Sequence, residues 1–153
     1  SQCAQMTKKL LQEDLGALRP GPGETVGQQL YLRYGITGVR GQAAAGFPEV
    51  LHIGLPKLEA GIAQGLSLND AACGALLALI AHTVDTNMIS RGGIDLQQET
   101  ARQIGLLLEQ MPVPDEETLD ALNDSFVDKN LSPGGCADLL AITLLLHFLK
   151  EKL

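Results

Sequence analysis

Three clusters of polar and glycine residues interrupt an otherwise apolar sequence, and the first contains His82, Asp85, Thr86 and Asn87, followed by Arg91. At about 100° per residue, His82, Asp85 and Thr86 share one face of a continuous helix. An imidazole, a carboxylate and a hydroxyl on a largely apolar helix are costly to bury without hydrogen-bond partners. The cluster predicts either a hydrogen-bond network that ties helices together or a binding site, and the spacing leaves both interpretations open.

The second cluster runs from Ser132 to Asp138 as Ser-Pro-Gly-Gly-Cys-Ala-Asp, at the expected start of the last helix. Gly134 and Gly135 would let backbone N–H groups approach an anion at the positive end of the helix dipole, as phosphate sites often require. Ser132 as a cap and Pro133 at the first helical position also suit an ordinary helix start, so a well-made cap is the alternative.

Asp138 is expected to point toward the apolar side of this last helix. Helical spacing groups it with Ala141, Ile142 and Leu145, and places Thr143 and His147 on the opposite face. A carboxylate directed into apolar surroundings indicates a metal ion, a cationic partner or a ligand hydroxyl.

The third cluster surrounds Arg40 with glycines, four of which fall between residues 35 and 46. This density predicts a loop that folds over a phosphate with Arg40 as its counter-charge, although no Gly-Lys-Ser/Thr follows, so the segment is not a Walker loop. Because buried carboxylates need a shared partner, Asp85 and Asp138 are predicted to lie close together across two helices, with Arg40 or Arg91 near them.

The cysteines indicate no disulfide framework and no zinc site. Cys3, Cys73 and Cys136 are odd in number and form no Cys-x-x-Cys pair, which fits a reducing cytoplasm. Cys136 at a helix start could have a lowered pKa and serve a thiol hydrolase together with His82, but a small packing residue is the simpler interpretation.

The elements that position these clusters are predicted to be helices throughout, because Leu, Ala and Ile recur at helical spacing and aromatic residues make up only 3% of the chain. The fold class is therefore all-α, a multi-helix bundle of about six to eight helices around a buried central pair that begins near Asn69 and Pro133. The remaining helices are expected over residues 2–18, 24–34, 95–110, from 47 with a bend before Pro56, and from 115.

Charge and hydropathy exclude two classes of partner. With 18 acidic and 11 basic residues the net charge is -7, which argues against nucleic acid and anionic membranes as partners. The longest apolar run is interrupted by Thr143 and His147 and is too short to span a bilayer, and no signal peptide is recognisable. These features predict a cytoplasmic protein that acts on a small molecule.

At the same three clusters the sequence resembles the triphosphoribosyl-dephospho-coenzyme A synthase family, which makes the prosthetic-group precursor of citrate lyase and malonate decarboxylase. The matching segments are 34–41 with 46–48, 85–87 with 91–93, and 131–135 with 137–140. Cys136 stands where the family usually has serine, and Gln42 where it usually has glutamate.

The resemblance implies a transferase that joins the ribose of ATP to 3'-dephospho-coenzyme A and releases adenine. It makes Asp85 and Asp138 the expected catalytic residues and candidate Mg²⁺ ligands, with magnesium inferred from the triphosphate rather than from a ligand motif. The residues expected to bind nucleotide or phosphate are Arg40, Gly41, Asn87, Arg91, Ser132, Gly134 and Gly135.

Family members are longer than this chain. Residues 1–153 are therefore expected to form a single helical domain that corresponds to the carboxy-terminal half of the family fold and is inactive alone. The alternative is a nucleotide-binding or oligomer-forming half without activity. An uncovered apolar face would favour a homodimer or association with the missing amino-terminal half. The helix start at 132–135, the loop around Arg40 and the segment 82–87 are predicted to line one anion-binding cleft.

Overall fold

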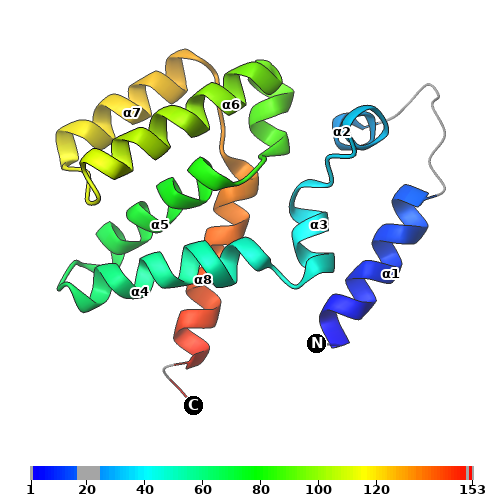
Figure 1. The fold of residues 1–153 in the computed structure, drawn as a ribbon, viewed down its shortest axis with the longest axis horizontal. Helices are drawn as coiled ribbons and strands as arrows, with labels where there is room; N and C mark the ends of the chain where they lie inside the picture. Colours follow the sequence, from blue (N-terminus) through cyan, green and yellow to red (C-terminus); the bar gives the residue numbers. More distant parts are fainter. Residues whose placement is uncertain (1, 17–24, 151, 153) are drawn as a thin grey trace.

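A computed structural model describes residues 2–16, 25–150 and 152 of the chain. It contains eight α-helices, one π-helical turn and, within these residues, no strand (Figure 1). The all-α prediction is confirmed. In chain order the elements are α1 (Gln2–Gly16), α2 (Val26–Tyr34), α3 (Gly38–Ala45), η1 (Val50–Gly54), α4 (Leu55–Ala63), α5 (Leu68–His82), α6 (Thr86–Gln110), α7 (Glu116–Asp128) and α8 (Gly134–Lys150).

Side-chain caps explain where several helices begin. The Ser67 hydroxyl accepts the Asp70 N–H at 3.1 Å and caps α5. Asp115 caps α7 by accepting the Thr118 N–H at 2.9 Å. At the last helix the Pro133 carbonyl accepts the Ala137 N–H at 2.9 Å, so this proline precedes the first helical residue instead of occupying it.

The glycine-rich segment 35–46 is mainly helical, and the prediction of a loop there is wrong. Its glycines act at the ends: Gly35 and Gly46 have φ values of 69° and 84° and close α2 and α3 in the left-handed conformation that other residues seldom adopt. Between them, residues 38–45 form α3.

The continuous helix predicted to carry His82, Asp85 and Thr86 is two helices. α5 ends at His82, and Asp85 caps the start of α6. α6 then continues to Gln110 with a kink at Gly93, where φ is 84°. No glycine or proline marks this break, but an aspartate whose side chain accepts backbone N–H groups competes with the helix and starts a new one. His82, Asp85 and Thr86 therefore do not share a helix face.

Pro56 lies in the first turn of α4, where its missing N–H costs no hydrogen bond. The π-helical turn η1 precedes it and ends at Gly54, the position near which the sequence predicts a bend.

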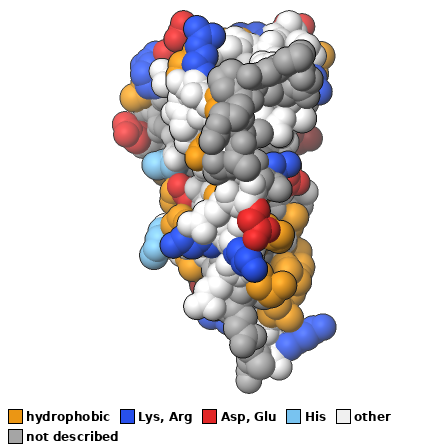
Figure 2. All heavy atoms as spheres, turned by 90° about the vertical axis from the view of Figure 1, so that its right-hand side faces the viewer, with side chains coloured by type: hydrophobic (Ala, Val, Ile, Leu, Met, Phe, Trp, Pro, Cys, Tyr) orange, Lys and Arg blue, Asp and Glu red, His pale blue; other side chains and the backbone are white. Residues whose placement is uncertain are grey.

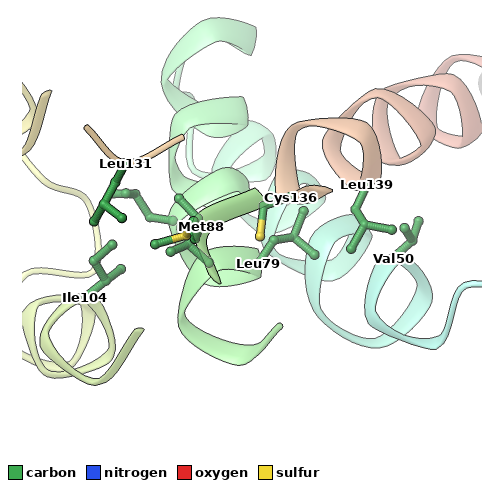
Figure 3. Close-up of a cluster of buried hydrophobic side chains, with 9 residues drawn as sticks. Val50, Leu79, Met88, Ile104, Leu131, Cys136 and Leu139 are labelled. Carbon is green, nitrogen blue, oxygen red and sulfur yellow. The ribbon is translucent and has the colours of Figure 1, made fainter. Parts of the chain in front are cut away.

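α5 and α8 occupy the centre of the fold and contact each other, and both also contact η1, α4 and α6. The core between them is built from fully or almost fully buried aliphatic residues (Figure 3). Its labelled members are Val50, Leu79, Met88, Ile104, Leu131, Cys136 and Leu139. The start of α6 and the start of α8 are anchored in this core through Met88 and Cys136, so their positions are fixed by packing.

No single described helix is long and apolar enough to cross a bilayer. The pair α5 and α6 passes such a test only when taken together, and it is bent by 54° at the break.

Candidate functional site

Asp85 joins the starts of two helices. Its Oδ1 atom accepts the N–H groups of Asn87 at 2.8 Å and Met88 at 3.2 Å, in the first turn of α6. Its Oδ2 atom accepts the N–H of Cys136, in the first turn of α8, at 2.8 Å. The side chain is almost completely buried, with 1% of the residue exposed. The negative charge therefore sits at the positive ends of both helix dipoles, which is the arrangement that stabilises a buried carboxylate.

Glycines bring the α8 start against this carboxylate. A Cβ atom on Gly135 would lie 3.2 Å from the Asp85 carboxyl carbon, and one on Gly134 would lie 2.7 Å from Asn87 Nδ2. Two consecutive glycines thus allow the backbone of α8 to touch the first turn of α6. Ser132 lies just before this turn and is half-buried.

The start of α3 reaches the same place. A Cβ atom on Gly38 would lie 2.9 Å from Thr86 Cγ2, so the backbone of α3 contacts the first residue of α6. Thr37 precedes α3 but makes no capping hydrogen bond to its first turn. Within the helix, a side chain on Gly41 would overlap Thr37 Oγ1. The three sequence clusters, far apart in the chain, therefore meet at three helix starts.

The two predicted arginines are both exposed and project from these helices. Arg40 lies in the first turn of α3. Arg91 lies in the second turn of α6, and its Nη1 atom donates to Asn130 Oδ1 at 3.1 Å, which links it to the connection that leads into α8. Asn87 is also exposed and lies in the first turn of α6.

The predicted orientation of Asp138 is wrong. Asp138, Ala141 and Leu145 lie on the exposed face of α8, whereas Thr143 and His147 are 0% and 8% exposed and face the interior. Both faces of this helix are rich in apolar residues, so periodicity could not identify the buried one. Asp85 and Asp138 consequently do not share a buried partner, because one is enclosed and the other faces solvent.

The groups proposed for thiol chemistry do not form a reactive pair. Burial raises the pKa of the Cys136 thiol far above its ordinary value, and the neighbouring negative charge of Asp85 and its hydrogen bond to the thiol raise it further. The expectation of a lowered pKa is therefore wrong. His82 is exposed, and its Nδ1 atom lies 2.9 Å from the Ala78 carbonyl oxygen in its own helix.

A magnesium ion would find one suitable carboxylate here. Within residues 2–16, 25–150 and 152, no three or more His, Cys, Asp and Glu side chains form a group that could hold a metal ion. Asp85 uses both oxygens on backbone N–H groups, so the accessible donor is Asp138. Mg²⁺ is commonly held by one or two carboxylates together with substrate phosphates and water, so Asp138 fits only a cation that arrives with a phosphate ligand.

A cavity of about 520 Å³ lies elsewhere, between α4, the start of α5 and the connection from α6 to α7. None of the residues predicted for nucleotide binding lines it. Its polar lining includes Lys57 of α4, Asp70 and Cys73 of α5, and Asp115 before α7, which come from three separate segments with no shared motif. The sequence does not reveal this cavity, because it forms only when α4, α5 and the connection from α6 to α7 pack together.

Comparison with known proteins identifies relatives. The model of the family described as ATP:dephospho-CoA triphosphoribosyl transferase matches residues 1–153. A probable 2-(5''-triphosphoribosyl)-3'-dephosphocoenzyme-A synthase of Vibrio cholerae is 39% identical over 154 residues, covering 96% of this chain and 48% of the relative. A synthase of the same name from Pectobacterium atrosepticum is 44% identical over 126 residues, covering 80% of this chain and 40% of the relative.

A third relative, a probable synthase from Streptococcus mutans, is 34% identical over 149 residues, covering 96% of this chain and 50% of its own length. The chain thus spans about half the length of the curated relatives it matches. The family model nevertheless runs through all of residues 1–153, which gives no support to the expectation of an incomplete family domain. No solved structure matches the chain.

Proposed function

The chain belongs to the ATP:dephospho-CoA triphosphoribosyl transferase family, and we propose that it binds the triphosphate of ATP where the starts of α3, α6 and α8 meet. In this proposal the bound ATP is the donor in a transfer of its triphosphoribosyl group to 3'-dephospho-coenzyme A.

The observation that carries the proposal is the meeting of three helix starts, two of which share the carboxylate of Asp85 while the third contacts Thr86. Each helix N-terminus is equivalent to roughly +0.5 of an elementary charge. Asp85 neutralises part of this charge at α6 and α8, while the first turn of α3 has no side-chain cap. An anion with several oxygen atoms is the ligand that complements such a surface.

The residues divide into those that shape the site and those that contact phosphate. Asp85 is a positioning residue, because its oxygens hold the helix starts in place. The flexible backbone and polar groups near the phosphates come from Gly41, Asn87, Ser132, Gly134 and Gly135. Arg40 and Arg91 supply positive charge from the two exposed edges of the site.

Asp138 is the carboxylate left for the reacting sugars. It is exposed one half-turn beyond Cys136, where it can accept a hydrogen bond from a ribose hydroxyl. A magnesium ion carried by the triphosphate would find its protein ligand here and would neutralise phosphate charge.

The proposed reaction is a glycosyl transfer. A ribose hydroxyl of dephospho-coenzyme A attacks the anomeric carbon of the ATP ribose, the bond from that carbon to adenine breaks, and the hydroxyl proton is lost as adenine leaves protonated. The triphosphate remains on the transferred ribose. The described residues serve this reaction by fixing the triphosphate, and thereby the anomeric carbon, in one position.

A second function, nucleotide binding without transfer, is favoured by one feature. Of the two carboxylates expected to act in catalysis, Asp85 is buried and fully engaged by three backbone N–H groups. A site with one accessible carboxylate can bind phosphate as well as a site with two. It has fewer groups that could transfer a proton during the reaction.

The two functions are separated by adenine release. We expect ATP to raise the melting temperature of the chain, and we expect Arg40→Ala to weaken ATP binding by at least about ten-fold, as the loss of a charge-assisted hydrogen bond requires. Chromatography of mixtures of the chain, ATP and dephospho-coenzyme A measures free adenine. Adenine release supports transfer, and binding without adenine supports the second function.

Arg102→Ala is the matched control. Arg102 is an exposed arginine of α6 that pairs with Glu99 at 2.7 Å, far along the helix from its start. Its removal takes away the same charge but should leave ATP binding unchanged. If Arg40→Ala and Asp138→Asn both leave binding unchanged in a chain that binds ATP, the triphosphate site lies elsewhere.

A further inference from the structure

The outer face of α8 is an apolar stripe that the described fold leaves uncovered. The helix packs Leu139 and Thr143 into the core, and both are completely buried. On the opposite side Leu145, Phe148 and Leu149 are 55%, 44% and 49% exposed. Ala141, one turn earlier on the same side, is also exposed. Monomeric proteins seldom expose a row of large apolar side chains on one helix, so this face indicates an interaction surface.

The stripe has the spacing of a helix–helix seam. Positions 138, 141, 145, 148 and 152 alternate steps of three and four, and all five residues are exposed. The Lys152 N–H donates to the Leu149 carbonyl at 3.2 Å, which keeps Lys152 on the helical path beyond the end of α8. The neighbouring Lys150 is engaged elsewhere, because its Nζ atom pairs with Glu59 of α4 at 2.8 Å.

The charges at the two ends of the stripe are opposite. Asp138 stands at its beginning and Lys152 at its end, with Leu145 midway between them. Leu145 is flanked along the stripe by a small residue, Ala141, on one side and a large residue, Phe148, on the other. The stripe is therefore complementary to itself when it is reversed.

We propose that α8 packs antiparallel against α8 of a second copy of this chain, with a twofold axis at Leu145. In this register Leu145 meets Leu145 of the second copy, Ala141 faces Phe148 of the second copy, and Asp138 faces Lys152 of the second copy. A small residue opposite a large one fills the seam, and the two charge pairs fix its direction. Antiparallel helix dipoles also attract each other. Because Asp138 takes part in both, this dimer and the proposed ribose contact of Asp138 exclude each other.

The position of the stripe leaves it accessible. In Figure 1 α8 runs down to the C-terminal end at the lower edge of the molecule. Figure 2 shows hydrophobic side chains gathered on the lower part of the molecule as seen from the side of α1 and α2. In the proposed register Lys152 of the second copy lies beside Asp138, so a second copy extends along α8 as far as the exposed side of its first turns.

The first test is the mass of the chain in solution across a range of protein concentrations. Sedimentation should give a reversible dimer with twice the 16.2 kDa mass of the chain. Leu145→Glu places two carboxylates face to face on the axis and should weaken the dimer at least 100-fold. Val127→Glu is the matched control, because Val127 is 68% exposed on α7 and lies outside the stripe. Circular dichroism should show unchanged helix content in both variants.

The second test is a charge reversal. Asp138→Lys and Lys152→Asp should each weaken the dimer by about ten-fold, because each creates two like-charge pairs across the twofold axis. The double variant carries both changes and should recover the original affinity. In a parallel dimer residue 138 would meet residue 138 of the second copy, and residue 152 would meet residue 152. Like charges would then face each other in every variant, and the double variant would show no recovery of affinity relative to the single variants.

Cysteine cross-linking tests the register directly, in a background with Cys3 and Cys73 replaced by serine. Leu145→Cys should form a disulfide-linked dimer on oxidation. Ala141→Cys should not, because the two copies of this position are separated by about eight residues along the seam, or about 12 Å. The proposal is overturned if the chain stays monomeric at all concentrations, if Leu145→Glu leaves the dimer intact, or if both cysteine variants cross-link equally. A monomer whose stripe binds a different polypeptide would likewise overturn it.

Discussion

Asp85 accepts three backbone N–H groups with two oxygens, and only an ionised carboxylate can do this without a donor of its own. Asp85→Asn would turn an NH₂ group toward one of these N–H donors. We expect the variant to lose about 2–4 kcal/mol of unfolding free energy, because a buried charge-assisted hydrogen bond is lost and a donor is left unpaired. Urea denaturation followed by circular dichroism measures the change.

Asp138→Asn is the control for this prediction. Asp138 is exposed, so the substitution should change the unfolding free energy by less than about 0.5 kcal/mol. Equal effects of the two substitutions would mean that Asp85 is not the carboxylate that holds the helix starts together.

Cys136 is expected to resist alkylation in the folded protein. Burial beside Asp85 keeps the thiol protonated at neutral and mildly alkaline pH, and the nucleophilic thiolate is therefore absent. Iodoacetamide should modify the half-buried Cys73 and leave Cys136 intact until urea unfolds the chain, as peptide mass spectrometry would show. Rapid modification of Cys136 in the native protein would contradict its described surroundings.

Among the elements, α6 offers two glycines with opposite requirements. Gly93 has φ of 84° at the kink, with open space around its Cβ position, so Gly93→Ala should cost about 1–2 kcal/mol through backbone strain alone. Gly105 lies in regular helix, and the nearest atom to a Cβ there is Ala81 Cβ at 3.9 Å. Gly105→Ala should therefore stabilise the chain by about 0.5–1 kcal/mol.

Thermal and urea unfolding of both variants test the kink. If Gly93→Ala proved as stabilising as Gly105→Ala, α6 would be straight in solution.

The elements also explain what could be predicted from the sequence. Helical content and the helix starts near residues 69 and 115 could be recognised, because apolar spacing and the polar residues that favour a helix start are encoded within a few residues. The break before α6 could not, since no glycine or proline marks it in residues 82–87. What ends α5 and starts α6 is a side chain that also bonds to α8, and only the folded chain brings that partner close.

The candidate site divides in the same way. The convergence of the three clusters could be predicted, because each combined glycine with a polar or charged group suited to phosphate. The orientation of Asp138 could not be predicted, because α8 is apolar on both sides and the choice of buried face depends on η1, α4 and α5.

At the scale of the whole molecule, α1 reaches the rest of the fold mainly through α3, the helix that carries Arg40. Leu15 of α1 is 6% exposed, so Leu15→Ala should cost about 2–3 kcal/mol and loosen α3. Amide hydrogen exchange should then accelerate in α3 more than in α5. Met6→Ala on the same helix is the control, because Met6 is 68% exposed and its loss should change little. Unchanged exchange in α3 after Leu15→Ala would show that α1 does not support it.

Asp85 and Cys136 lie 51 positions apart, so their hydrogen bond closes a loop that contains all of α6 and α7. When the chain folds, closing this loop has an entropic cost, which grows by only about 0.6 kcal/mol for each doubling of the loop length. Residues inserted into the connection at 111–115 would therefore lengthen the loop at little cost and leave both helix starts clamped by the same carboxylate. The segment between α6 and α7 is thus a part of the molecule where length can change in evolution without moving the starts of α6 and α8.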